Sequence, residues 1–350
     1  MRYALSNLCS MGIVRLLLAI FVIASHTSYG LFFDGRTSVI IFYMISGYLM
    51  TYVLNTSYIK SNWNFYKNRL LKIYIPYWAV CLLTIFYYNI WLGGTSVLSP
   101  SGLGLKIWSV LSNIFILTQD LGWIFAVTPD GEINYLPYGS AGIGHGLCNY
   151  AIVMPIFTVA MELYFYFLAP FFLRCRYKTF IFLFIGVAYT VIAHRTHHRD
   201  LVHIYHFFPA TLVYFGLGAT LCWLYKLEKD SFKNPMLYLL FLTCVIAVCL
   251  SSKVITNEHF LFTLLSIPVL FEISSLSKLD QFLGKFSYPI YLIHMPVVWA
   301  LKARGLDWGK GLFYKTLWIS LLIAIIIHFL IETPLEKWRR NIRKNALSNT

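Results

Sequence analysis

Residues 11–28 read MGIVRLLLAIFVIASHTS, an apolar stretch of membrane length that contains two ionisable side chains, Arg15 and His26. A charge within such a stretch is costly and therefore marks a candidate functional site. The eleven-residue spacing, at about 100° per residue, makes three turns plus roughly 20°, so both side chains fall on nearly the same helix face, about 16 Å apart. We predict that Arg15, near one membrane surface, and His26, deep in the bilayer, face one cavity. This arrangement suits an enzyme whose long substrate enters from the Arg15 side and reacts near His26.

The composition indicates that most of the chain lies in lipid. The sequence is 59% hydrophobic and 12% charged, whereas a soluble domain of this size carries about twice that charged fraction. The net charge of +14 is spread over short loops and a tail, which argues against a nucleic-acid-binding surface. The seven cysteines have no metal-binding or disulfide spacing, so we interpret them as small apolar residues.

Apolar runs of membrane length predict an all-α, polytopic helix bundle with about ten transmembrane helices in a single domain, residues 1–350. The first run is long and lacks a cleavage site, so we expect a retained helix rather than a secretory signal. A further run, 108–127, is interrupted by Gln119, Asp120 and Gly122, and we expect a re-entrant or surface segment there. The predicted spans are 12–33, 38–56, 73–93, 150–173, 179–194, 203–225, 236–252, 258–275, 287–303 and 312–331.

The distribution of Lys and Arg predicts the orientation. With ten spans and the N-terminus inside, 19 of the 28 basic residues fall in inner segments and 9 in outer segments. Counting 108–127 as a full span would reverse every later loop and spoil this asymmetry. We therefore predict that both termini are cytoplasmic. Neither half of the chain repeats the other, which counts against an inverted-repeat transporter.

The longest segment between spans, about 94–149, is rich in Gly, Ser and Pro and is predicted to lie outside. It could form a mobile lid or an acceptor-binding loop, or it could simply connect two helices. Its glycines do not form a phosphate-binding loop, because no Gly-Lys-Ser/Thr follows them and no strand–helix context exists.

Arg15 and His26 are the first candidates for chemistry. A neutral imidazole in a cavity can take the proton of an alcohol that attacks a thioester, so His26 is the candidate general base. Arg15 keeps its charge and suits phosphate or carbonyl oxygens. The structural alternatives are a helix–helix hydrogen bond for His26 and a cytoplasmic anchor for Arg15. Their position on one helix face favours the catalytic interpretation.

Two further segments combine packing signals with chemistry. Ser46 and Gly47 let helix backbones approach closely in lipid, while the orientation of the neighbouring Tyr43 stays open. Arg69 and Lys72 precede a proline at the predicted cytoplasmic edge. These two cations could grip the phosphates of a cytosolic donor or bind lipid headgroups.

Glu162 lies deep in an apolar run, and Tyr166 follows one turn later on the same face. A lone buried carboxylate must be protonated, paired with a cation or placed in a wet cavity. In a later span, Ser287, Tyr291 and His294 occupy positions i, i+4 and i+7 and make one polar stripe. Alternatively, this polar stripe makes hydrogen bonds to neighbouring helices of the bundle.

Glu332 ends the last predicted span, where it could pair with Arg15 or Arg69 or remain solvated. A histidine cluster lies in an outer loop and the start of the next helix, but no carboxylate or cysteine except Asp200 completes a ligand set, so we predict no metal site. Its members are His194, His197, His198, His203 and His206.

These elements, in this order, resemble the acyltransferase-3 family of integral membrane acyltransferases. The match covers nearly the whole chain and rests on six motifs in order. The matching residues are Arg15 and His26 at the family spacing, Ile45-Ser46-Gly47-Tyr48-Leu49, Arg69 with Pro76, Thr158 with Glu162, Phe165 and Tyr166, Gly284 with Ser287, Tyr288, Tyr291, Leu292 and His294, and Glu332 with Pro334.

The resemblance implies acyl transfer, usually of acetyl from acetyl-CoA, to a sugar hydroxyl on a lipid-linked or surface glycan. It implies a bacterial inner-membrane protein that uses acetyl-CoA as a donor substrate, with no bound cofactor or metal and no nucleic-acid partner. The donor would enter from the cytoplasm. The residues implied are His26, Arg15 and Glu162 in catalysis, Arg69, Lys72 and Glu332 in donor binding, and Ser46, Tyr166, Ser287, Tyr291 and His294 as cavity lining.

Three departures from the family pattern are visible. Phe157 replaces a tryptophan and Val159 a leucine beside Glu162, and Lys72 stands where a second arginine is common, which would change phosphate geometry. A fused extracytoplasmic esterase-like domain, which some members carry, is not expected. The rival interpretations are a transporter of anionic or sugar-like solutes, a succinyl- or other acyltransferase, and a non-enzymatic membrane component. A covalent acyl-enzyme stays open.

Overall fold

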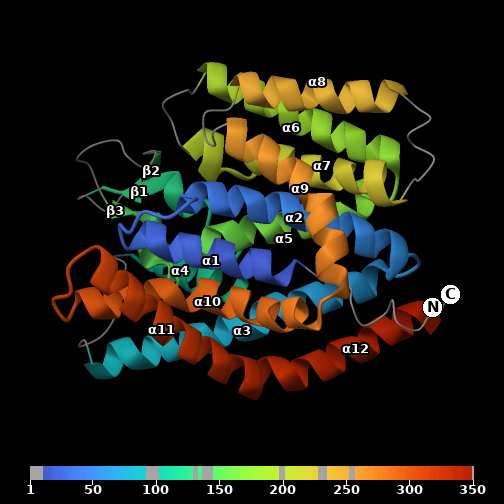
Figure 1. Cartoon of the computed structure of the whole chain (residues 1–350). Coiled ribbons are helices and arrows are strands. Elements are labelled where there is room, and N and C mark those ends of the chain that lie inside the picture. The colour runs from blue at the N-terminus through green and yellow to red at the C-terminus, as the bar shows by residue number, and fades with distance from the viewer. Residues whose placement is uncertain are drawn as a thin grey trace.

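The computed structural model describes residues 11–91, 102–128, 133–135, 145–196, 202–227, 235–251 and 257–348. Over these ranges the chain forms a bundle of long helices with a small sheet at one side (Figure 1). The α-helices are α1 (Gly12–His26), α2 (Gly35–Thr56), α3 (Asn62–Trp91), α4 (Leu103–Phe115), α5 (Ile156–Phe172), α6 (Arg176–Thr196), α7 (Phe208–Cys222), α8 (Pro235–Ser251), α9 (Asn257–Leu276), α10 (Lys278–Lys302), α11 (Lys310–Ile327) and α12 (Thr333–Ser348).

Each of the ten predicted spans overlaps one of these helices, α1 to α3 or α5 to α11, and the predicted helix bundle is confirmed. The bounds differ most at α1, which ends at His26 rather than at residue 33, and at α3 and α10, which begin at Asn62 and Lys278 rather than at residues 73 and 287. Two π-helical turns, Val202–His206 and Trp223–Leu227, flank α7, and a third, His328–Glu332, joins α11 to α12. By length and composition, five helices of the described chain are long and apolar enough to cross a membrane. They are α2, α3, α6, α7 with the π turn that follows it, and α11 with its continuation.

The interrupted run 108–127 is not one continuous helix. Helix α4 ends at Phe115, and Ile116 and Thr118 then adopt positive φ values of 64° and 68°. Tyr164 of α5 ties down the segment that follows, because its hydroxyl donates to Asp120 at 3.0 Å and accepts from the Thr118 backbone N–H at 2.9 Å. The polar residues that interrupt the run therefore mark the place where α4 ends and the chain docks on α5.

A three-stranded antiparallel sheet, which the sequence did not predict, follows this segment. A 3₁₀ turn, Leu121–Trp123, leads into the central strand β1 (Phe125–Val127), which pairs with β2 (Ile133–Tyr135) and β3 (His145–Gly146). A second 3₁₀ turn, Leu147–Tyr150, leads on toward α5. Residues 94–101, 129–132 and 136–144 of the predicted outer segment, the proposed lid or acceptor loop, lie outside the described residues.

A buried carboxylate holds α1 on α10. Asp280, only 3% exposed, accepts hydrogen bonds from the first two backbone N–H groups of α1, those of Gly12 at 2.7 Å and Ile13 at 2.9 Å. An acceptor at this end of a helix satisfies donors that have no partner within the helix. Gly12 also meets Gly284 of α10, where an added Cβ would lie 2.4 Å from the Gly12 Cα atom. These contacts set the position of Arg15, one turn further along α1.

Helices α2 and α7 cross with their backbones in close contact. A Cβ atom added at Gly47 would lie 2.1 Å from the carbonyl oxygen of Phe215, and one added at Gly218 would lie 1.9 Å from that of Met44. Small residues permit this distance between helices in lipid. Gly47 therefore packs as the sequence suggested, which fixes the adjacent Ser46 in the bundle.

Arg174 organises the connection between α2 and α3. Its guanidinium group donates to the backbone carbonyls of Leu54 at 3.1 Å, Tyr58 at 2.6 Å and Ile59 at 2.6 Å, and to the Asn62 side chain. The last carbonyls of a helix need such donors because they have no partner within the helix. Arg174 thus shapes the turn that leads to Arg69.

Candidate functional site

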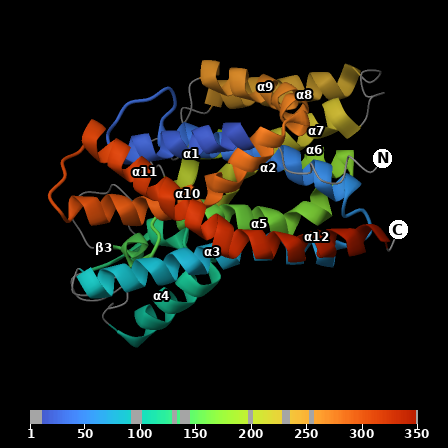
Figure 2. The ribbon, with the colours of Figure 1, turned by 60° about the horizontal axis from the view of Figure 1, so that its bottom comes forward.

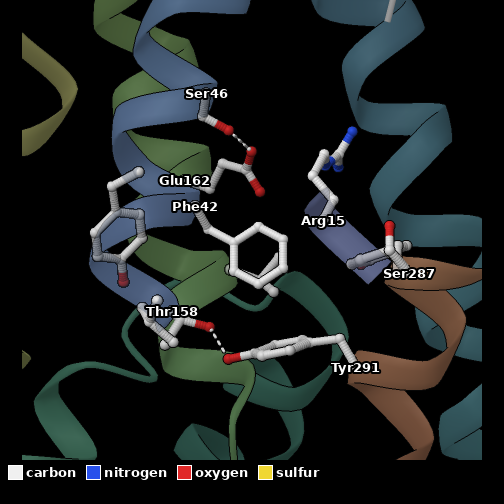
Figure 3. Close-up of a pocket in the computed structure, with 11 residues that line it drawn as sticks. Arg15, Phe42, Ser46, Thr158, Glu162, Ser287 and Tyr291 are labelled. Carbon is white, nitrogen blue, oxygen red and sulfur yellow. Dashed lines mark hydrogen bonds between the residues drawn. The ribbon is translucent and has the colours of Figure 1, made fainter. Parts of the chain in front are cut away.

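A polar cavity lies inside the bundle between α1, α2, α5 and α10 (Figure 3). It holds about 510 Å³ of empty space, part of which is open to the outside. Its walls combine one cation, one carboxylate and several hydroxyl groups with apolar side chains. The lining residues are Arg15, Val39, Phe42, Tyr43, Ser46, Thr158, Val159, Glu162, Ser287, Tyr288 and Tyr291.

Glu162 supplies the carboxylate of this cavity. Its Oε1 atom accepts a hydrogen bond of 2.6 Å from the Ser46 hydroxyl and a second one from the Tyr166 hydroxyl. These two donors offset part of the cost of burying a charged group. In Figure 3 the other carboxylate oxygen points into the cavity, and it accepts no hydrogen bond from the described part of the chain. Glu162 therefore has one oxygen fixed by the protein and one directed at the empty space.

Arg15 faces Glu162 from the opposite wall (Figure 3). The guanidinium group extends from α1 beside Ser287 of α10, and no ion pair joins Arg15 to Glu162 among the described residues. Both charged groups are thus available to a polar molecule between them. Charged side chains that face an internal space of a membrane bundle are typical of a substrate path.

Tyr291 and Thr158 close one end of the cavity. Their hydroxyl groups form a 2.6 Å hydrogen bond across the space between α10 and α5 (Figure 3). Tyr291 was predicted to line the cavity, whereas Thr158 was not assigned there. The spacing carried a usable signal, because Thr158 precedes Glu162 by four residues and so shares its helix face.

His26 does not line the cavity that contains Arg15, contrary to the expectation that both face one space. It is the last residue of α1, is exposed, and lies against His294, with ring centroids 5.4 Å apart. On α10, Tyr291 lies between Ser287 and His294; Ser287 and Tyr291 line the cavity, whereas the two histidines are not among its lining residues. The shared helix face was predicted, but the contact of His26 with His294 was not.

His294 lies next to the cavity rather than in its lining. The residue is 0% exposed, and its Nδ1 atom lies 2.7 Å from the carbonyl oxygen of Tyr291. Because a carbonyl only accepts, we assign the hydrogen to Nδ1, which leaves Nε2 as an acceptor in the neutral ring. This Nε2 atom is buried and has no hydrogen-bond partner among the residues that the structure describes. The Nε2 atom of His294 is therefore a buried acceptor, close to His26, that could accept a hydrogen bond from a bound molecule.

Arg69 does not line the cavity but lies against Tyr166, which contacts Glu162. Arg69 is only 4% exposed, and its guanidinium group lies 5.9 Å from the ring centroids of both Phe65 and Tyr166. Tyr166 itself stands behind Glu162 and does not line the cavity, which corrects its predicted place. The hydroxyl of Tyr166 interacts electrostatically with both Arg69 and Arg15. Arg69 is thus a buried neighbour of the cavity, and Lys72, one turn further along α3, is half-buried.

Glu332 pairs with His328, at 3.1 Å, within the π-helical turn that follows α11. The sequence suggested a pair with Arg15 or Arg69 instead. The structure differs because a carboxylate four residues along the same helix reaches His328 without crossing the bundle.

The outer histidines form no metal site in the described residues, where no three His, Cys, Asp or Glu side chains are grouped to hold an ion. His206 stacks on Trp123, with ring centroids 4.5 Å apart, and His203 lies 3.4 Å from the Tyr135 hydroxyl. His197 and His198 lie outside the described residues.

Comparison with known proteins gives one match. A model of the acyltransferase-3 family, described as an acyltransferase domain, matches residues 10–332. That range contains every helix from α1 to α11 and every side chain of the cavity. No curated protein and no solved structure matches the chain.

Proposed function

The chain belongs to the acyltransferase-3 family, and on this basis we propose that it transfers an acetyl group from cytosolic acetyl-CoA to a hydroxyl of a cell-surface or lipid-linked glycan. The observation that supports this most is the polar cavity inside the bundle, with Arg15 and Glu162 on facing walls and His26 at the end of the helix that carries Arg15. We place the protein in a bacterial inner membrane with both termini in the cytoplasm. The start of α1 and α12 lie at the same end of the bundle, which supports placing both termini on one side of the membrane (Figure 1).

The residues divide into a donor side and an acceptor side. On the donor side, Arg69 and Arg15 would hold anionic or carbonyl oxygens of acetyl-CoA, while Ser46 and Glu162 bind the polar groups of its pantetheine arm. The arm has to pass the Tyr291–Thr158 contact before the thioester reaches the acceptor. This contact therefore separates the two sides of the reaction.

His26 would act as general base on the acceptor side. It takes the proton of the sugar hydroxyl while the hydroxyl oxygen bonds to the thioester carbonyl carbon. The carbon–sulfur bond then breaks, the ester forms, and coenzyme A leaves as a thiolate that takes up a proton. The developing oxyanion needs a positioned donor or cation, for which Arg15 and Tyr291 are the candidates nearest to the path.

An assay with purified protein in liposomes tests this function. Radiolabelled acetyl-CoA and a glycan extract from the native cell should yield free coenzyme A and labelled glycan together. Comparing the rates with acetyl-CoA, succinyl-CoA and longer acyl-CoA donors in the same assay shows which acyl group the protein transfers. If no thioester is consumed with any donor, uptake of sugar-like or anionic solutes into the liposomes becomes the next measurement, and the transporter interpretation gains.

Two substitutions of His294 test whether its Nε2 atom supports His26. His294→Asn keeps a donor where Nδ1 reaches the Tyr291 carbonyl but removes Nε2, whereas His294→Gln places an amide near the Nε2 position. We expect about a tenfold loss of kcat and a shifted pH profile for His294→Asn, with partial recovery in His294→Gln. If both variants keep the wild-type kcat and the wild-type pH profile, His294 has a purely structural role.

A further inference from the structure

Helix α12 lies beyond the residues that match the family model and carries a compact cluster of arginines. All three arginines of α12 surround one carboxylate, that of Glu336. Arg339 Nη1 lies 3.0 Å from Glu336 Oε2, while Arg343 Nη2 and Arg340 Nε lie 3.0 Å and 3.5 Å from Oε1. One carboxylate thus holds three guanidinium groups side by side.

The arginine cluster is fixed to α3, the helix that carries Arg69 and Lys72. Asn68 of α3 exchanges hydrogen bonds with Arg339, accepting at 3.0 Å and 3.2 Å and donating to its backbone carbonyl at 3.1 Å. Lys67 lies 5.6 Å from the ring centroid of Trp338. Figure 2 shows α12 as a long helix at the edge of the bundle, and its packing on α3 is direct. The cluster therefore occupies the same end of the bundle as the predicted donor cations.

Several cations act on the Glu336 carboxylate. Burial raises the pKa of the Glu336 carboxyl, but Arg339, Arg343, Lys72 and Arg340 outweigh burial and hold that pKa below its usual range. Arg340 and Arg343 thus share one carboxylate oxygen of Glu336 with each other, while further cations act on the same carboxylate. Glu332, the nearest acidic residue along the chain, is occupied by His328. Like charges held this close repel one another, and an anionic ligand would relieve that repulsion.

Exposure distinguishes this cluster from Arg69. The Arg69 side chain lies inside the bundle, where it can reach an arm that threads the cavity but not a nucleotide at the surface. The Arg340 side chain is 64% exposed, and that of Arg343 is 17% exposed. Guanidinium groups bind phosphate oxygens through paired N–H donors, and the carboxylate of Glu336 keeps their planes in place.

We propose that Arg340 and Arg343, together with Lys72, bind the phosphate groups of the nucleotide part of the acyl-CoA donor. The inference rests on the proposed function, because it takes the donor to be an acyl-CoA that approaches from the α12 end. It adds a phosphate site on a helix that the family model does not include. A phospholipid headgroup offers the same chemistry, and the experiment separates these two sources of phosphate.

The test compares two donors in the double variant Arg340→Ala/Arg343→Ala. Acetyl-CoA carries the phosphates, whereas acetyl-pantetheine presents the same thioester without them. We expect the KM for acetyl-CoA to rise by about 10- to 100-fold, with kcat and the KM for acetyl-pantetheine close to the wild-type values. Lys178→Ala, which removes an exposed cation at the start of α6, is the matched control and should change neither KM. Arg340→Lys/Arg343→Lys should recover part of the loss.

Binding of radiolabelled coenzyme A to wild type and double variant gives a second readout that needs no turnover. Weaker binding by the double variant alone supports the site. Unchanged binding, or a change of KM by the same factor for both donors, overturns it while leaving the proposed function in place. A loss that occurs only in vesicles with anionic phospholipid, and with both donors, assigns the cluster to lipid headgroups and also overturns it. If wild type transfers no acyl group and binds no coenzyme A, the proposed function and this inference fail together.

Discussion

Replacing His26 by alanine is expected to lower the rate of acyl transfer by about 10²- to 10⁴-fold, the usual contribution of a general base. Without the imidazole, the proton of the sugar hydroxyl has no positioned acceptor as the oxygen attacks the thioester. The side chain is exposed at the end of α1, so its removal leaves no cavity in the core. Release of coenzyme A and labelling of the glycan measure the effect.

His259→Ala is the matched control for the loss of an imidazole near the α1–α2 connection. The His259 ring packs on Phe32 and Phe33, with centroids 5.4 Å and 5.1 Å away, and does not touch His26 or the cavity. We expect activity within about twofold of wild type for this control. Both variants should bind coenzyme A and melt in detergent as wild type does. Full activity of the His26 variant would remove His26 from the proton transfer.

The sequence predicted helix positions well because bilayer thickness fixes how long an apolar run must be. It also brought Arg15, Ser46, Glu162, Ser287 and Tyr291 into one set, and the structure places all five around one cavity. Each is a polar residue within or at the edge of an apolar run. Burial of such a residue is costly unless other polar groups surround it, so polar residues on different helices tend to meet.

What the sequence could not predict depends on how the helices pack. The Tyr291–Thr158 contact at the cavity joins residues that lie 133 positions apart. Asp280 caps α1 from 268 positions away, and no local pattern marks a carboxylate for that role. The small sheet was missed for another reason, since strands of two or three residues carry too little alternation to detect.

The arginines of α12 were counted as basic residues of a cytoplasmic tail, which is the usual meaning of such residues near a membrane. Their grouping depends on the helical spacing of Glu336 with residues three, four and seven positions later. That spacing was visible in the sequence. The position of these arginines beside Arg69 and Lys72 was not visible, because it depends on the docking of α12 on α3.

Replacing Gly47 by alanine is expected to destabilise the bundle by about 3 kcal/mol, the upper part of the usual range for overpacking. The added Cβ would lie 2.1 Å from the Phe215 carbonyl oxygen and 2.9 Å from its carbonyl carbon. Both atoms belong to the backbone of α7, so no side-chain rotation relieves the overlap and the helices must move apart. Because Ser46 directly precedes Gly47, that shift also disturbs the hydrogen bond from the Ser46 hydroxyl to Glu162. The melting temperature in detergent and the rate of acyl transfer should fall together.

Gly311→Ala separates this overlap from the general effect of changing glycine to alanine in a helix. Gly311 lies in α11, and a Cβ atom there would meet nothing within 4 Å. Alanine favours the helical backbone over glycine by about 1 kcal/mol, so this control should leave stability unchanged or raise it. The same substitution at Gly47 carries that gain as well, and its net loss therefore understates the overlap with α7. Equal melting temperatures for the two variants would mean that α2 and α7 are not in contact at Gly47.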